Sequence, residues 1–362
     1  MNAWHMAEQS TAHGLGATAR TLPVRITGCA GGFPEQGSWV ANEAVHALRF
    51  GPDWKRAMAA QGADPTYYEA KLGVRRRYWA HMPGKANHKG ALTSVDLMAA
   101  AAPTALAQAG VVPGEVDALI AVTITAPRYT TASAALLAHR LGVRAPAFDL
   151  RSGCASGIYA LVVAAQLIES GARHVLIAAG DTNSKILDPG NNTVYAGGDA
   201  GAAVVLSRAT GTAGMLASYL DLDGAWAGHT GVPGLLPPTV EEVEAHRYYM
   251  EWRDDGKEEV LDRAWRLIPE RLYARAGLAA TDLACFVPHQ ASKRQLAVAM
   301  EAAGIGQERT VNVLGEYGNC GPATLFLALE RAFQDQLIQP GSRYMLAAAG
   351  GGLAWGGVIL QH

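Results

Sequence analysis

The sequence predicts an α/β protein with buried sheets, assembled from two similar halves. Short runs of β-branched and aliphatic residues, bounded by Gly, Pro or Asp, alternate with segments of helical length. Runs that are apolar at every position are typical of strands covered by helices on both faces. The third observation is an internal repeat, because HVLIAAGD…AGGDAGAAVVLS at 174–207 resembles RYMLAAAGGGLAWGGVIL at 343–360. Each copy reads as an apolar strand, a glycine cluster and a second apolar strand, which indicates a duplicated unit.

The first half is predicted to consist of strands joined by helices. A helix at 93–110 begins at Thr93 and Ser94, has the acidic Asp96 in its first turn, and ends at Gly110. A second helix is expected at 154–170, before Gly171. The expected strands are 24–27, 118–125, 147–150, 174–179 and 202–206.

The second half repeats this plan, with a boundary near residues 208–213. We therefore expect a flexible leader at 1–22, an N-terminal half at 23–210 and a C-terminal half at 211–362. The segment 225–255 is rich in Gly, Pro, Trp and acidic residues, and it is either a cap over a site or a surface excursion. The expected strands of this half are 214–220, 284–288, 310–313, 344–348 and 357–360, and its helices are 260–276, 292–303 and 322–335.

Composition excludes several classes of protein. The 30 Lys and Arg residues nearly balance the 32 Asp and Glu residues, which argues against a general nucleic-acid binder. With 49% hydrophobic and 17% charged residues, the chain can bury a large core. No apolar stretch approaches the roughly 18 residues of a membrane span, and the start has no signal-peptide pattern. The four cysteines form no disulfide framework and no pair with metal-ligand spacing, so we expect a cytoplasmic protein without a metal site.

Cys154 is the candidate nucleophile. It lies in RSGCASG at 151–157, where a strand turns through glycine and a helix of small residues is expected to begin. A helix N-terminus favours a thiolate over a thiol, and the thiolate is the attacking species. The small neighbours leave room for a substrate carbonyl beside the sulfur. From these residues alone, a buried structural cysteine is an equal alternative.

Two further motifs carry polar side chains at the ends of predicted elements. His289 in PHQAS follows a strand and precedes a helix that begins at Ser292, a position suited to a general base or a hydrogen-bond donor. Asn319 lies between glycines in EYGNCGPAT, where an uncharged carboxamide can donate to a developing oxyanion. Taken singly, a structural histidine and a turn asparagine are the alternatives.

Together these motifs resemble the β-ketoacyl-acyl-carrier-protein synthase III group of the thiolase superfamily. The resemblance rests on Cys154 in its strand-to-helix turn, on His289 in PHQAS, on Asn319 in YGN and on the closing GGGLAWG at 350–356. Supporting matches are KLGVRRRYWA, AFDLRSGCASGIYAL and GGDAGAAVVL. The matches cover residues 24–360 in the order and with the spacing of the family.

The resemblance implies a duplicated five-layer α-β-α-β-α thiolase fold and a homodimer. It also implies that Cys154 is acylated by a thioester donor carried on coenzyme A or acyl carrier protein. His289 and Asn319 then hold a malonyl-type thioester and stabilise the enolate formed on loss of CO2, and that carbon attacks the acyl-cysteine. The backbone N–H groups of Cys154 and Gly351 form the oxyanion hole. Coenzyme A and phosphopantetheine thioesters are substrates, and no cofactor is expected.

The positions that contact the carrier depart from the family pattern. Tyr67 and Lys71 stand where coenzyme A-primed members place Trp and Arg. Some members use a further arginine to contact the nucleotide, and this chain has Asn191 and Asn192 near that position instead. This favours an acyl carrier protein as donor. Its acidic face would meet basic residues of this chain, which otherwise are ordinary surface charges: Arg75, Arg76, Arg77, Lys293 and Arg294.

Thr130 aligns with a bulky Phe of acetyl-selective members, with Tyr129 beside it. We therefore expect a pocket that accepts primers longer than acetyl.

Several rival functions are less compatible with these residues. A thiolase needs a second cysteine in the C-terminal glycine loop, where this chain has Gly350, Gly351 and Gly352. A papain-like protease carries its cysteine near the mature N-terminus, and a silent dimer subunit loses the nucleophile. The alternative that stays open is a synthase III-like acyltransferase that makes an ester or amide without decarboxylation. The residues after Cys154 and Asn319 favour a role in secondary metabolism over housekeeping initiation of fatty acids.

Overall fold

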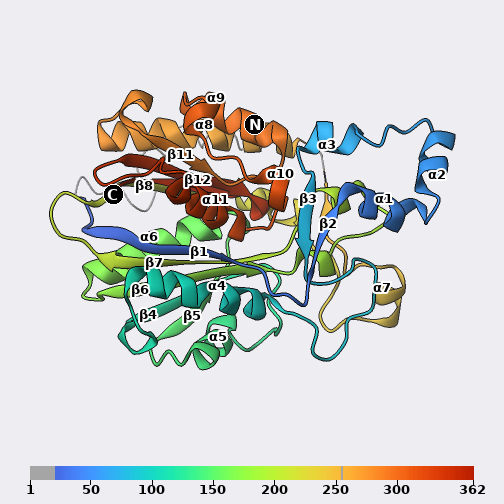
Figure 1. Cartoon of the computed structure of the whole chain (residues 1–362), viewed down its shortest axis with the longest axis horizontal. Helices are drawn as coiled ribbons and strands as arrows, with labels where there is room; N and C mark the ends of the chain where they lie inside the picture. Colours follow the sequence, from blue (N-terminus) through green and yellow to red (C-terminus); the bar gives the residue numbers. More distant parts are fainter. Residues whose placement is uncertain (1–20, 254–255) are drawn as a thin grey trace.

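The computed structural model describes residues 21–253 and 256–362, so the predicted leader at 1–22 lies almost wholly outside the described residues. Two sheets are stacked with helices outside and between them, in five layers (Figure 1). Helices α4 (Ser94–Ala109) and α5 (Ser133–Leu141) cover one outer face. Helices α8 (Lys257–Ala276) and α9 (Lys293–Ala303) cover the other. This is the fold class that the sequence resemblance implies.

The first sheet has the strand order β1-β7-β6-β4-β5, and the second has the order β11-β12-β13-β8. Strands β4, β5 and β6 are parallel to one another, and β11 is parallel to β12. The carboxyl ends of the strands in each group therefore lie on the same side of their sheet. The first sheet consists of β1 (Val24–Gly32), β4 (Ala118–Val122), β5 (Ala147–Leu150), β6 (His174–Asp181) and β7 (Ala200–Arg208). The second consists of β8 (Gly214–Leu222), β11 (Cys285–Pro288), β12 (Arg343–Gly350) and β13 (Ala354–Gln361).

The strand orders repeat, because β8-β13-β12-β11 follows the same path as β1-β7-β6-β4. The fifth place is occupied by residues 310–313, for which the sequence predicted a strand. That prediction is wrong, since the segment joins β11 only through one bridge between Thr310 and Phe286. The Gln290 side chain replaces the missing ladder: Nε2 donates to the Val311 carbonyl at 2.8 Å, and Oε1 accepts from the Val313 amide at 2.9 Å.

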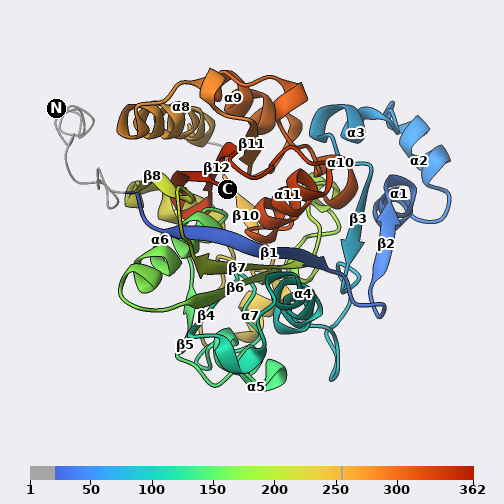
Figure 2. The ribbon, with the colours of Figure 1, turned by 60° about the vertical axis from the view of Figure 1, so that its left-hand side comes forward.

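The middle layer consists of α6 (Ser156–Glu169) and α11 (Ala323–Gln334), which pack between the two sheets. Figure 2 shows α11 and α4 on opposite sides of β1. Both middle helices are buried along nearly their whole length and carry small or aliphatic side chains, so the core between the sheets is continuous. Separate apolar clusters lie beneath α4 and beneath α8.

The remaining elements flank this core. The antiparallel pair of β2 (Ser38–Ala41) and β3 (Arg76–Trp79) lies beside α10 (Leu314–Tyr317). The helices near it are α1 (Asn42–Phe50), α2 (Trp54–Ala60) and α3 (Tyr67–Leu72). The segment at 225–255 contains β9 (Thr230–Gly231), α7 (Val240–Glu244) and β10 (Glu251–Trp252). Short 3-10 turns are η2 (Pro113–Glu115), η3 (Asn183–Lys185), η4 (Asn192–Tyr195), η5 (Gly224–His229), η6 (Ala280–Asp282), η7 (Gln307–Arg309) and η8 (Gly351–Leu353).

Most predicted elements occur within a few residues of their expected bounds. Helix α4 is one example, because Thr93 and Asp96 form a reciprocal capping box and Gly110 ends the helix in a left-handed conformation. Within the described residues, no helix combines the length and apolarity needed to cross a membrane.

Candidate active site

Cys154 lies in the turn between β5 and α6, beyond the carboxyl end of a parallel strand. Helix α6 begins at Ser156, so the prediction that a helix starts at the cysteine itself is wrong by two residues. The Ser156 hydroxyl accepts from the Ser152 amide at 2.6 Å and donates to the Gly153 carbonyl at 2.6 Å. These bonds close a turn ahead of the helix, in which Gly153 has a φ of +54°.

A second glycine turn, from the other half of the chain, packs against Cys154. A Cβ atom on Gly350 would lie 2.5 Å from the Cβ of Cys154 and 2.8 Å from its Sγ. A Cβ on Gly153 would lie 2.0 Å from the carbonyl oxygen of Gly351. Only glycine permits this approach, so the repeated glycine clusters place the end of β12 directly beside the sulfur.

Burial of the Cys154 sulfur opposes the thiolate that a helix N-terminus is expected to favour. Burial of the sulfur raises the pKa of the Cys154 thiol to about 11. Hydrogen bonding by the backbone N–H groups of Gly351 and Cys154 lowers the pKa, and the nearby charge of Asp181 raises it. Desolvation outweighs the two N–H groups, so the free enzyme holds a thiol at neutral pH. The two N–H groups are those expected to form the oxyanion hole, and both act on the sulfur.

His289 follows β11 and is fully buried. Its backbone amide donates to the Ala347 carbonyl at 2.8 Å, which ties it to β12 three residues before Gly350. Neither ring nitrogen has a hydrogen-bond partner among the described residues. Burial lowers the pKa of His289 to about 4, so the imidazole is neutral at neutral pH, with one nitrogen able to donate and the other able to accept.

Asn319 lies in the loop between α10 and α11. Its backbone amide donates to the Ala196 carbonyl at 2.8 Å, and its carbonyl accepts from the Gly198 amide at 3.0 Å. The side-chain Oδ1 accepts from the Gly321 amide at 3.0 Å. Because that bond engages the oxygen, the amide group Nδ2 is the part of the side chain left to donate to a substrate.

Cys154 and Asn319 each contact the opposite half of the chain, and His289 is bonded to β12, whose end touches Cys154. Cys154 touches Gly350, His289 is bonded to the strand that ends at Gly350, and Asn319 is joined through Gly321 to the neighbourhood of Asp181. The charge of Asp181 in turn acts on Cys154. Among the described side chains, no hydrogen bond links Cys154, His289 and Asn319 to one another directly. Each is therefore held by its own backbone contacts.

The segment at 225–255 packs against the glycine turn of η8 through η5 and β9. The methyl group of Thr230 lies 3.3 Å from the position of a Cβ on Gly351, so β9 packs against the glycine turn. The Met250 amide donates to the Ile186 carbonyl at 2.7 Å. Residues 231–253, including α7, are largely exposed.

Gln290 is a residue of the site that sequence reasoning left without a role. It is fully buried directly after His289, and its side chain holds the segment at 310–313. The Gln290 carboxamide also accepts from the Leu314 amide at 2.9 Å. The one feature of the sequence that could have indicated a role for Gln290 is its position in PHQAS, directly after His289.

The predicted carrier-binding residues differ in their exposure and in the side chains that they contact. The Tyr67 side chain is 48% exposed, and the Lys71 ammonium donates to its hydroxyl at 3.0 Å. Thr130 is exposed. Arg294 forms ion pairs with Asp262 at 2.6 Å and with Glu258.

Arg77 is fully buried, so the expectation that it meets a carrier protein is wrong. It donates to the Asn42 side chain at 2.7 Å and to the Tyr195 carbonyl at 2.8 Å. Arg75 and Lys293, by contrast, line a groove of about 900 Å³ between α3 and α9.

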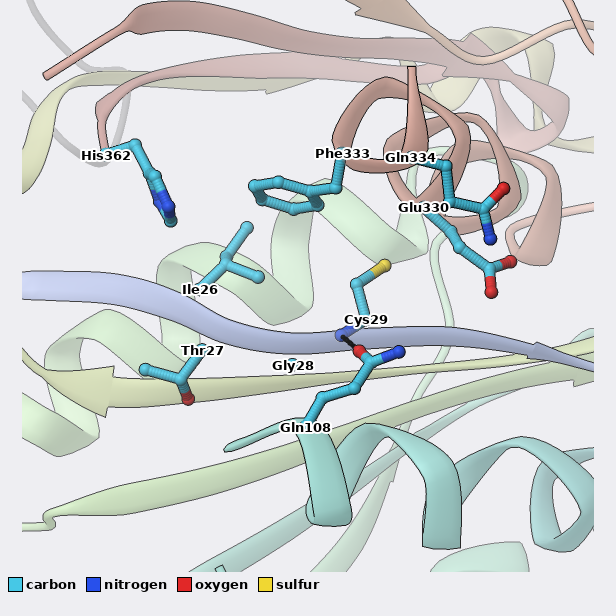
Figure 3. A pocket seen from close by; sticks show the side chains of 9 residues that line it. All are labelled: Ile26, Thr27, Gly28, Cys29, Gln108, Glu330, Phe333, Gln334 and His362. Carbon is cyan, nitrogen blue, oxygen red and sulfur yellow. Dashed lines mark hydrogen bonds between the residues drawn. The ribbon is translucent and has the colours of Figure 1, made fainter. Parts of the chain in front are cut away.

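A second cavity, of about 360 Å³, lies along β1 between α4 and α11 (Figure 3). Cys29 lines this cavity, and its thiol donates a hydrogen bond to the Phe326 carbonyl at 3.3 Å. Burial raises the pKa of this thiol well above its usual range. None of the predicted site residues lines this cavity. In the described part of the chain, no group of three or more His, Cys, Asp or Glu side chains is arranged to hold a metal ion.

Comparisons with known proteins point to one family. The family model of 3-oxoacyl-[acyl-carrier-protein] synthase III matches residues 148–224. The model of the C-terminal part of that family matches residues 273–362. The chain is 35% identical over 305 residues to β-ketoacyl-[acyl-carrier-protein] synthase III 3 of Streptomyces coelicolor, covering 81% of this chain and 88% of that protein. It is 34% identical over 302 residues to the synthase III of Brucella suis, covering 80% and 88%.

Solved structures agree. The 3-oxoacyl-(acyl carrier protein) synthase III of Pseudomonas aeruginosa superposes with a TM-score of 0.78 and 30% identity, over 94% of this chain and 98% of that one. A priming β-ketosynthase of a polyketide biosynthetic pathway superposes with a TM-score of 0.78 and 25% identity, over 95% and 97%.

Substituting Gly350 tests the contact between the two turns. Gly350→Ala places a methyl group against the Cys154 sulfur, so we expect acylation of Cys154 to fall by at least a hundredfold, measured by intact mass over time. Gly114→Ala, in η2 and outside the site, is the control for the substitution itself, because a Cβ there would meet no atom within 4 Å. Normal acylation of Gly350→Ala would contradict the packing described here.

The raised pKa of Cys154 predicts a pH dependence of alkylation. A thiol whose pKa is raised to about 11 is protonated at neutral pH, so its reaction with iodoacetamide is slow there and rises about tenfold per pH unit toward pH 10. Peptide mass mapping at Cys154 gives the rate. A plateau already reached at neutral pH would show that the thiolate is the resting form.

Proposed function

Since this chain belongs to the 3-oxoacyl-[acyl-carrier-protein] synthase III family, we propose how its own residues carry out that family's reaction. The chain is an acyltransferase with the thiolase fold, of the decarboxylative condensing type. The observation that carries the assignment of residues is the packing of Gly350 from one half against Cys154 from the other. It leaves the sulfur, a buried neutral imidazole and a carboxamide around one junction.

Acyl transfer begins at Cys154. Its sulfur attacks the carbonyl carbon of an acyl thioester, a new C–S bond forms, and the C–S bond to the carrier breaks. The thiol proton leaves with the carrier's sulfur. The backbone N–H groups of Cys154 and Gly351 stabilise the oxyanion of the tetrahedral intermediate, and removing one such donor typically costs roughly a hundredfold or more in rate.

Condensation follows on the same sulfur. The malonyl thioester loses CO2, and the electron pair of the broken C–C bond passes into an enolate. His289 and Asn319 Nδ2 donate to the enolate oxygen. Both donors are uncharged, which suits an interaction that strengthens as negative charge develops and contributes about 3–4 kcal/mol per donor. The enolate carbon then attacks the acyl-cysteine, a C–C bond forms, the C–S bond breaks, and the Cys154 thiolate takes a proton.

Arg75 and Lys293 support an acidic acyl carrier protein as partner. They line the groove between α3 and α9, whereas Arg294 is held by acidic side chains of α8 and Arg77 is buried. Tyr67 and Lys71 on the exposed face of α3 form an aromatic and cationic pair for a nucleotide or phosphopantetheine, with the Lys71 ammonium 5.4 Å from the ring centre.

A homodimer is supported by the open edge of the first sheet. Strand β5 is the edge strand, Tyr129 before it is 85% exposed, and Phe148 on it is 37% exposed. An uncovered edge with exposed aromatic residues favours pairing with a second copy. Thr130 lies at the same face and would there shape a pocket for primers longer than acetyl.

We place the enzyme in the cytoplasm, in initiation of fatty-acid or polyketide chains, and treat 23–210 and 211–362 as its two halves.

Intact mass spectrometry tests this function. The protein is incubated with acyl-CoA and acyl-carrier donors of graded chain length, with and without malonyl thioester. We expect an adduct that is absent from Cys154→Ala, is largest for acyl groups longer than acetyl, and disappears with release of CO2 when malonyl thioester is added. Asn319→Ala should keep the adduct and lose the CO2 release.

Other outcomes of this experiment would contradict the proposal. Loss of the adduct to an alcohol or amine without CO2 would establish the acyltransferase alternative. A strict preference for acetyl would contradict the role of Thr130, and a monomeric native mass would contradict the dimer.

A charge reversal tests the docking groove. Lys293→Glu should raise KM for the carrier-protein substrate by about tenfold at low salt, with less effect at high salt, because rim charges act mainly on association. KM for the coenzyme A substrate should change little. Lys89→Glu, an exposed lysine before α4 outside the groove, is the control. Equal effects of both variants would exclude docking at this groove.

A further inference from the structure

A layer of buried polar residues at the end of β6 lies directly beneath Asn319. Asn183 belongs to this layer and is only 5% exposed. Its Nδ2 donates to the Gly198 carbonyl at 3.0 Å and to the Asn319 carbonyl at 3.2 Å. Turning the carboxamide over would set its oxygen against two carbonyl oxygens, so these bonds fix its orientation.

We propose that Asn183 is a positioning residue for the condensation step, acting by fixing the loop from which Asn319 reaches the substrate. This inference rests on the proposed role of Asn319. Asn183 comes from the first half of the chain and Asn319 from the second, so the bond between them spans the junction at which Cys154 and His289 also lie.

The Asn319 loop is held by backbone bonds to Ala196 and Gly198 and, at Cys320, by the Thr324 hydroxyl, which accepts from the Cys320 amide at 2.8 Å. Asn319 is separated by Gly318 from a helix of four residues, α10, and by three residues, 320–322, from α11. Its main chain forms a single bridge, with Gly197, instead of a ladder. The Asn183 side chain is thus the one side-chain contact on the Asn319 main chain among the described hydrogen bonds. Because a displacement of about 1 Å in a catalytic group can cost roughly a hundredfold in rate, this contact bears directly on condensation.

Asp181 supports the same loop from below. Its Oδ1 accepts four hydrogen bonds from Thr123, Ile124 and Thr125, with distances between 2.7 and 2.9 Å. These bonds hold the carboxyl group rigidly, and its Oδ2 lies 2.9 Å from the position of a Cβ on Gly321. The Gly321 amide is the group that donates to Asn319 Oδ1. Asp181 therefore backs the turn that orients the Asn319 side chain, while Asn183 holds its main chain.

The two half-reactions separate positioning from general stability. Acylation of Cys154 does not use Asn319, whereas condensation does. In Asn183→Ser and Asn183→Ala, we expect the condensation rate to fall by about 10- to 100-fold. The rate of Cys154 acylation should stay within about twofold of the unmodified protein, as measured by intact mass.

Asn42→Ala is the matched control. Asn42 is also a buried asparagine, and its side chain donates to the Val74 carbonyl at 2.9 Å and accepts from Arg77, but it does not touch the Asn319 loop. It should lose comparable stability, seen as a lower Tm, and leave the ratio of the two half-reactions unchanged.

Each other outcome overturns the proposal. Equal losses in both half-reactions would show a structural role, and unchanged condensation would show no role. Failure of both Asn183 variants to fold, while Asn42→Ala folds, would likewise assign Asn183 to folding. Asn319→Ala is measured in parallel: if it condenses normally, the proposed function of Asn319 fails, whereas if only the Asn183 variants condense normally, this inference alone fails.

Discussion

The site depends on the contact between two glycine turns that belong to different halves of the chain. Gly153 and Gly350 leave no room for a side chain at the points where the turns meet, and this lack of space places Cys154 against the end of β12. The duplication explains why glycine clusters recur at the ends of equivalent strands. One cluster surrounds Cys154, the candidate nucleophile of the first half, and the other supplies the backbone that faces it. The active site is thus a product of how the two repeats pack together.

Burial shifts the pKa values of Cys154 and His289 in opposite directions, and for both groups it favours the uncharged form. Removal from water disfavours charge, so the pKa of Cys154 rises to about 11 and that of His289 falls to about 4. Both groups are neutral in the free enzyme. A neutral imidazole can donate to an enolate oxygen without forming a fixed ion pair with the malonyl carboxylate.

Local sequence patterns predicted the α/β class, the two similar halves and the candidate residues, and the resemblance to synthase III implied the five-layer fold. The Thr93 and Asp96 pair marked the start of α4, and the motifs around Cys154, His289 and Asn319 each ended up beside a strand or helix end, where the pattern placed them. The failures involve long-range partners. Residues 310–313 have strand-like composition, but the Gln290 side chain occupies their backbone groups. Arg77 belongs to a run of three arginines, yet it alone is buried, because Asn42 and Tyr195 accept its hydrogen bonds.

The central claim is that the two halves bring one thiol and two uncharged donors to the same reacting carbon. A crystal structure of the protein acylated on Cys154, with a non-hydrolysable malonyl thioester bound, tests it most directly. The account predicts His289 and Asn319 Nδ2 both within hydrogen-bond distance, about 3 Å, of the malonyl thioester oxygen. It also predicts the malonyl methylene carbon in van der Waals contact with the acyl carbonyl carbon. A malonyl group bound elsewhere, or an oxygen that contacts neither side chain, would contradict the account.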